Sequence, residues 1–182
     1  MRQSPRQKRP PRPLDKARLD ELALAYVARF ATSAAKLEAY LRRKLRERGW
    51  EGEGAPPVEA LVGRMVEFGY VDDAVYARAK SGSLMRRGYG VRRVDQALGA
   101  AGIAADLRDE VRAGKSEQRR AALALAARKR FGPFGDGAAD RAVREKQLAA
   151  MLRAGHPLDM ARELVNAATI EAAEQWAGEE EE

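Results

Sequence analysis

The chain of 182 residues carries 34 lysines and arginines against 27 aspartates and glutamates, so its net charge of +7 makes polyanions the natural class of partner. It holds no cysteine, which excludes disulfides and thiolate metal sites, and no apolar run approaches the roughly 20 residues of a membrane span. Because 45% of the residues are hydrophobic but only 6% aromatic, with much alanine, we expect closely packed helices in a cytoplasmic protein without a membrane partner.

The two ends of the chain are opposite in charge. Residues 1–13 hold five basic residues, no acid and four of the eight prolines, and cannot bury enough apolar surface to fold. We expect them to form a disordered basic arm. Residues 178–182 end in four glutamates and are predicted to be an acidic tail.

Hydrophobic periodicity predicts nine helices between these ends and no strand. Thr32 or Ser33 is expected to cap the second helix, and Asp72 and Asp73 the fourth. Ser116 is expected to cap the seventh. In the second helix, Leu37, Leu41 and Leu45 are expected to form the buried stripe. The fourth helix is predicted to run from its aspartate caps to about residue 87, and the fifth lies within 86–103. The others are predicted at about residues 14–31, 34–48, 57–68, 104–113, 116–131, 140–154 and 157–176.

The middle helix of each third of the chain ends in the same spaced pattern, which indicates an internal repeat. In repeat arrays no unit covers its own apolar face, and neighbouring units bury a continuous core. The sequence therefore predicts three helical repeats, at 14–71, 72–114 and 115–177. The matching sets are Leu41, Leu45, Gly49 and Trp50; Val94, Leu98, Gly102 and Ile103; and Gln147, Met151, Gly155 and His156.

The strongest basic block, RRGYGVRRVDQALGAAGI at 86–103, belongs to the second of these repeats. Glycines allow one helix to stop and the next to start within a few residues, and we expect Gly49, Gly88, Gly90, Gly102 and Gly155 to be such joints. Tyr89 either stacks on a base or inserts into a pocket of a partner, or its ring folds down on the joint. The predicted polyanion-binding residues, which point outward from the middle helices and this joint, are Arg43, Arg46, Arg86, Arg87, Tyr89, Arg92, Arg93, Lys146 and Arg153.

This block, together with FGYVDDAVYARAKS at 68–81, resembles the RecX family, the bacterial modulators of the RecA recombinase. The resemblance implies an all-α fold, an elongated, curved tandem array of three three-helix repeats. It also implies binding in the groove of the RecA–DNA filament, damping of its ATP hydrolysis and strand exchange, and no chemistry or cofactor of its own. The sequence departs from the family pattern at Ala97, Gly99, Ala100 and His156.

The leading hypothesis is therefore a non-enzymatic, monomeric regulator that contacts the RecA filament and single- and double-stranded DNA. The alternative is a general helical DNA-binding protein that acts without a recombinase. Basic charge alone does not separate these two functions. An enzyme is the third and weakest reading of the sequence.

Two patterns that hold metal ions elsewhere have simpler explanations here. Helix capping accounts for Asp72 and Asp73, because it needs only one carboxylate that accepts backbone N–H bonds. His156 is the single histidine and takes the place of Trp50 and Ile103 in the repeat, which predicts a packed residue rather than a ligand. We expect no metal site.

Two further patterns do not meet the requirements of catalysis or nucleotide binding. The sequence Gly114-Lys115-Ser116 lacks the earlier glycine of a P-loop, because position 109 is Asp, and a helix is predicted before it instead of a strand. Ser81 and Ser83 have no histidine nearby in sequence to activate them as nucleophiles.

Overall fold

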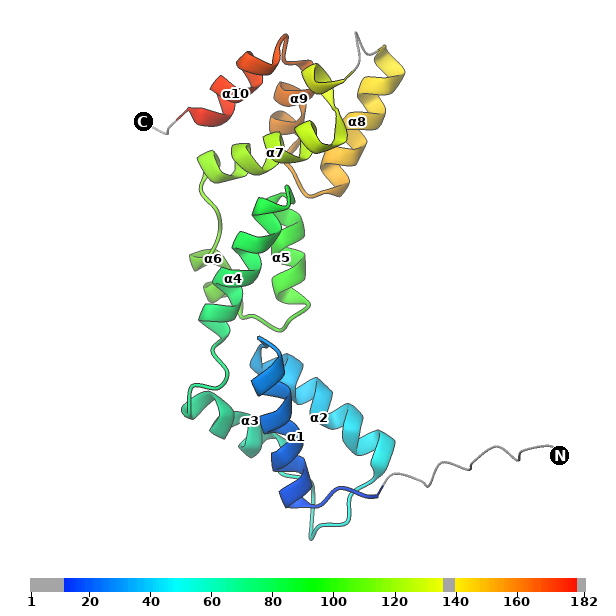
Figure 1. Ribbon diagram of the computed structural model, residues 1–182, viewed down its shortest axis with the longest axis vertical. Helices are drawn as coiled ribbons and strands as arrows, with labels where there is room; N and C mark the ends of the chain where they lie inside the picture. Colours follow the sequence, from blue (N-terminus) through cyan, green and yellow to red (C-terminus); the bar gives the residue numbers. More distant parts are fainter. Residues whose placement is uncertain (1–11, 136–139, 180–182) are drawn as a thin grey trace, which may run out of the picture. The chain divides into compact units, whose positions relative to one another are not determined.

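The protein is helical throughout the part that its computed structural model describes, residues 12–135 and 140–179 (Figure 1). Within these ranges the only β-type contact is an isolated bridge between Leu14 and Trp50, so the predicted all-α class is confirmed. None of the described helices is long and apolar enough to cross a bilayer. The predicted basic arm lies outside the described residues except for 12 and 13, and the predicted acidic tail except for 178 and 179.

The chain divides into two compact units, the first ending at Asp73 and the second beginning at Ala74. Helices of the first unit start and end close to the predicted positions. They are α1 (Lys16–Arg29), α2 (Ala34–Arg48) and α3 (Val58–Glu67).

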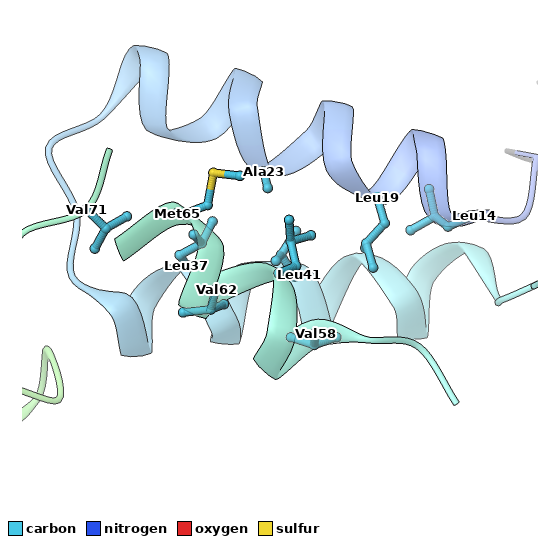
Figure 2. Close-up of a cluster of buried hydrophobic side chains, with 10 residues drawn as sticks. Leu14, Leu19, Ala23, Leu37, Leu41, Val58, Val62, Met65 and Val71 are labelled. Atoms are coloured by element: carbon cyan, nitrogen blue, oxygen red, sulfur yellow. The ribbon is translucent and has the colours of Figure 1, made fainter. Parts of the chain in front are cut away.

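One apolar core holds these three helices together. Figure 2 shows the side chains of Leu37 and Leu41 lying between the helices, and neither has any exposed surface. The predicted buried stripe of α2 is confirmed at these two positions, whereas Leu45 is only partly buried. Leu14 closes one end of the core, because its N–H donates a 3.0 Å hydrogen bond to the carbonyl of Gly49.

The N-terminus of α2 receives two side-chain caps. Ser33 accepts a hydrogen bond from the N–H of Lys36 at 3.3 Å, as predicted. Asp73 was expected to cap the fourth helix, but its carboxylate accepts the N–H of Ala34 at 2.9 Å instead. The reason is that Asp73 is already the first residue of the fourth helix, so its side chain is placed to reach another element. Two of the donors that a helix start leaves unpaired are thereby satisfied.

The second unit contains the remaining helices, which lie around two neighbouring apolar clusters. The unit begins within α4, whose first residue is the last of the first unit. Its elements are α4 (Asp73–Arg86), α5 (Val91–Gly99), α6 (Ala105–Glu110), α7 (Lys115–Lys129), the short 3-10 helix η1 (Gly132–Phe134), α8 (Arg141–Arg153), α9 (Leu158–Asn166) and α10 (Ile170–Gly178).

Helix α7 takes part in both clusters of the second unit. Its neighbouring residues Ala121 and Ala122 are buried in different clusters: Ala121 packs with residues of α4 and α5, and Ala122 with residues of α8, α9 and α10. The predicted repeats at 72–114 and 115–177 are therefore joined by α7 within one compact unit.

Two further predictions about helix ends are wrong. The expected single helix at 157–176 is two helices, because the chain leaves helical geometry at Ala167 and Thr169 starts α10 by accepting the N–H of Ala172 at 3.1 Å. Ser116 does not cap α7, which already begins at Lys115 with Gly114 at the cap position.

Replacing Leu41 with alanine is expected to lower the free energy of unfolding of the first unit by about 2–5 kcal/mol, because it leaves a cavity in the core. Urea denaturation followed by Trp50 fluorescence in a Trp176→Phe background measures this, since the two tryptophans lie in different units. Leu24→Ala is the control, because that side chain is 44% exposed and should change stability by about 0.5 kcal/mol at most. Equal midpoints for the two variants would contradict the described core.

Candidate polyanion-binding surface

The second unit presents its clearest basic surface on the first turn of α5. Val94 and Leu98 are buried on one side of this helix, which leaves Arg92 and Arg93 exposed on the other. Neither arginine has an ion-pair partner among the described residues. Since their charge is not neutralised within the described part of the chain, both are able to attract an external anion.

The start of α5 is fixed by the end of α8, and Figure 1 shows these two helix ends meeting. The N–H of Gly90 donates to the carbonyl of Ala154 at 2.9 Å, and the N–H of Arg92 donates to the carbonyl of Gly155 at 3.2 Å. Helix starts have unpaired N–H groups and helix ends have unpaired carbonyls. The two helices therefore satisfy each other's terminal groups, and their dipoles attract.

Glycine is required on both sides of this contact. A Cβ atom at Gly90 would collide with the main chain of Gly155, and one at Gly155 with the main chain of Arg93. Gly155 also has a φ of +97°, which side chains rarely allow. The two main chains approach this closely only because neither glycine carries a side chain.

The remaining predicted joints differ in what they contact. Gly88 has a φ of +77°, and a Cβ there would lie 2.9 Å from the backbone nitrogen of Leu125, so it too is a contact between helices. Gly49 and Gly102 have φ values of +82° and +75° and terminate their helices, but a Cβ at Gly49 would meet nothing within 4 Å.

The joint of α8 and α5 also brings cations of two predicted repeats together. Arg153 is the last residue of α8, two positions before Gly155, and it is exposed. Lys146 is exposed about 10 Å further back along the same helix. The structure therefore places the α8 cations on the helix that leads directly to the first turn of α5.

Arg43 and Arg46 are exposed on α2, in the first unit. Arg43 pairs with Glu47 at 3.7 Å and lies over the ring of Tyr40 at 5.7 Å. Local contacts therefore satisfy part of the charge that the sequence assigned to polyanion binding.

Arg86 and Arg87, at the end of α4, are both exposed. The guanidinium of Arg87 lies 5.4 Å from the ring centre of Tyr89, and its carbonyl accepts a 2.6 Å hydrogen bond from Arg128. The Tyr89 ring is half-buried against the cluster of α4 and α5. This placement corresponds to the packed alternative for Tyr89, and stacking on a base stays a prediction.

His156 is completely buried beside the joint. Its Nε2 lies 3.0 Å from the carbonyl of Gly88, and because a carbonyl only accepts, Nε2 carries the proton. Burial lowers the pKa of the imidazole, an effect that the bond to Gly88 partly offsets. Its Nδ1 has no hydrogen-bond partner among the described residues. The neutral imidazole of His156 therefore connects the joint at Gly155, the preceding residue, to the joint at Gly88 through a hydrogen bond.

The structure also locates the other patterns singled out in the sequence. Within 12–135 and 140–179, no group of three histidine, aspartate or glutamate side chains is placed to bind a metal ion. The hydroxyl of Ser81 donates to the carbonyl of Val111 at 3.3 Å. Helix α6, not a strand, precedes Gly114-Lys115-Ser116, which contradicts a P-loop there.

Sequence reasoning missed Ala154, whose carbonyl holds the start of α5. No side-chain signal could have identified it, since the main chain makes the contact. The only hint was that Gly155 occupies the same repeat position as Gly49 and Gly102.

Known proteins resemble this chain in sequence and in fold. Residues 72–111 match the family described as RecX, second three-helix domain. The chain is 31% identical over 165 residues to the regulatory protein RecX of Myxococcus xanthus, covering 86% of this chain and 88% of that protein. It is 41% identical over 102 residues to the regulatory protein RecX of Deinococcus radiodurans, covering 56% and 47%. The crystal structure of RecX from Lactobacillus salivarius matches the fold with a TM-score of 0.63 at 16% identity, over 82% of this chain and 93% of that one.

Gly90→Ala is expected to destabilise the second unit by about 1–3 kcal/mol, because the added methyl group separates the ends of α8 and α5. Urea denaturation followed by Trp176 fluorescence in a Trp50→Phe background measures the change. Gly114→Ala is the matched control, since a Cβ there meets nothing within 4 Å and its φ is −65°. If the two variants unfold at the same urea concentration, the close contact at Gly90 does not exist.

The second unit is expected to lose stability as the pH falls from 7.5 to 5.5. Because the pKa of His156 is lower in the folded chain than in the unfolded one, the unfolded state takes up a proton first. One proton limits the slope to about 1.4 kcal/mol per pH unit. Trp176 fluorescence should report this loss, and His156→Gln should remove it. The first unit contains no histidine and serves as the control through Trp50; an identical pH dependence in both units would exclude His156 as the cause.

Proposed function

The chain belongs to the RecX family of regulatory proteins, and from this premise we propose that it regulates homologous recombination and DNA repair by binding the RecA–DNA filament. In this proposal it has no catalytic activity and uses no cofactor. It reduces the ATP hydrolysis and strand exchange of the filament.

The observation that carries the proposal is the unneutralised basic surface at the joint of α8 and α5. The side chains of Arg92 and Arg93 extend from the first turn of α5, whose backbone is held by hydrogen bonds to the end of α8. The backbone positions of both arginines are therefore fixed before a ligand binds. Guanidinium groups bind phosphate oxygens in pairs of parallel hydrogen bonds. A fixed row of such groups suits the regular spacing of phosphates along a filament.

Inhibition follows from occupying a filament whose subunits must move relative to one another during hydrolysis. A protein that binds several points of the assembled filament stabilises one arrangement of its subunits over the others. The exposed cations Arg86, Arg87, Lys146 and Arg153 supply further contacts in the same unit. Arg43 and Arg46 supply contacts from the first unit.

The alternative function is that of a DNA-binding protein that needs no recombinase. Arg92 and Arg93 have no ion-pair partners among the described residues, and such arginines bind the phosphates of any nucleic acid. This observation favours the alternative. The two functions differ in their effect on RecA. Only the proposed regulator is expected to change ATP hydrolysis by RecA when it is present at less than one copy per RecA subunit.

The decisive experiment is single-strand-dependent ATP hydrolysis by RecA from the same organism, with this protein added at substoichiometric amounts. The proposed function predicts a fall in the hydrolysis rate. Unchanged hydrolysis at every ratio, together with salt-sensitive DNA binding, would favour the alternative.

The double substitution Arg92→Glu with Arg93→Glu is expected to abolish most of this inhibition, since it reverses the charge of the surface. Glutamates are favourable in the first turn of a helix, so circular dichroism should show unchanged helical content. Lys16→Glu with Arg29→Glu makes the same change of charge on exposed residues of α1 and is the control. Inhibition by the Arg92, Arg93 variant equal to that of the control would place the binding surface elsewhere.

A further inference from the structure

We propose that the groove between α4 and α7 is a second binding site, whose ligand is a nucleotide unit. The groove has a volume of about 550 Å³ and is also lined by residues 110–113, which precede α7. All its lining residues belong to the second unit. Except for Arg86, it uses none of the residues of the surface proposed above, and it requires no recombinase.

Four arginines line this groove. Arg78 and Arg86 come from one face of α4, Arg120 from α7 and Arg112 from the connecting segment. Among the described residues, Arg78, Arg86 and Arg120 have neither a hydrogen-bond acceptor nor an ion-pair partner for their side chains. Arg112 is paired with Asp109 at 3.0 Å. The guanidinium groups of Arg78, Arg86 and Arg120 are exposed, so an external phosphate can reach them, and their positive charge attracts it.

The rest of the lining indicates a nucleotide rather than a small anion. Glu110 and Glu117 also line the groove, and their carboxylates can accept hydrogen bonds from the sugar hydroxyl and base amino groups of a nucleotide. The floor includes Gly82, Ala121 and Met85, which leave an apolar surface for a base. Guanidinium groups also stack on planar rings. The lining thus offers partners for phosphate, sugar and base.

Gly82 controls the space in which Arg86 lies. A Cβ at Gly82 would come within 3.1 Å of a terminal nitrogen of Arg86, so the guanidinium lies over the position that a side chain would occupy. A leucine at this position would fill the floor and displace Arg86 without any change of charge. Since Gly82 lies within a helix, leucine should also favour the folded state.

The test uses the full chain carrying Arg92→Glu and Arg93→Glu, so that the surface proposed above contributes little. The probes are ATP, measured by calorimetry, and a fluorescent RNA oligoadenylate, whose units carry amino and 2′-hydroxyl groups, measured by anisotropy. Gly82→Leu and Arg120→Glu are each expected to raise the dissociation constant at least about tenfold for the probe that occupies the groove. Loss of ATP binding identifies a free nucleotide as the ligand, and loss of oligoadenylate binding alone identifies a unit of a single strand.

Each variant has a matched control. Gly63→Leu makes the same change within α3, where a Cβ meets nothing within 4 Å, and Lys129→Glu reverses a charge at the exposed end of α7 outside the groove. Both should leave the dissociation constants within about threefold. Groove variants that bind both probes like their controls would overturn the proposal. Equal competition by pyrophosphate, or stronger competition by a polyglutamate peptide, would also overturn it, because neither competitor has a base.

Discussion

Two hydrogen bonds between main chains fix the geometry on which the second unit depends. Gly90 and Arg92 donate their N–H groups to the carbonyls of Ala154 and Gly155, so the end of α8 and the start of α5 satisfy each other. Such groups cost free energy when they are buried without partners. Because the contact leaves no room for a Cβ on either side, it requires glycine at both position 90 and position 155, although these are 65 positions apart in the sequence.

Helix α7 extends this constraint from the joint to the whole unit. Its Leu125 lies against Gly88, its Arg128 donates to the carbonyl of Arg87, and its buried alanines take part in both apolar clusters. Loosening the joint therefore disturbs the packing on both sides of α7. In a repeat array each unit is stabilised by its interface with the neighbouring unit. Here backbone hydrogen bonds add a directional connection between the second and third predicted repeats.

Periodicity was sufficient to predict eight of the helices, and in all of these except α6 the apolar positions include buried residues. It failed at Ala167 and Ala168, since alanine is the best helix former and the break depends on the cap that Thr169 provides. The exposed cations were identifiable from charge and spacing. The partners of Gly90 were not, because main-chain atoms carry that contact, and the arginines of the α4–α7 groove come from three separate segments.

Exposed cations of the two units differ in the acids that lie beside them. On α2, Arg43 pairs with Glu47, and the pKa of that glutamate is lowered chiefly by its hydrogen bond to Lys44, so one acid of the helix serves both cations. On α5 the single acid, Asp95, is held by the guanidinium of Arg108 at 2.9 Å. It therefore does not neutralise the two arginines of the first turn. Arg43 of α2 thus meets a local acid, whereas Arg92 and Arg93 of α5 meet none among the described residues, although the two helices occupy equivalent places in the predicted repeats.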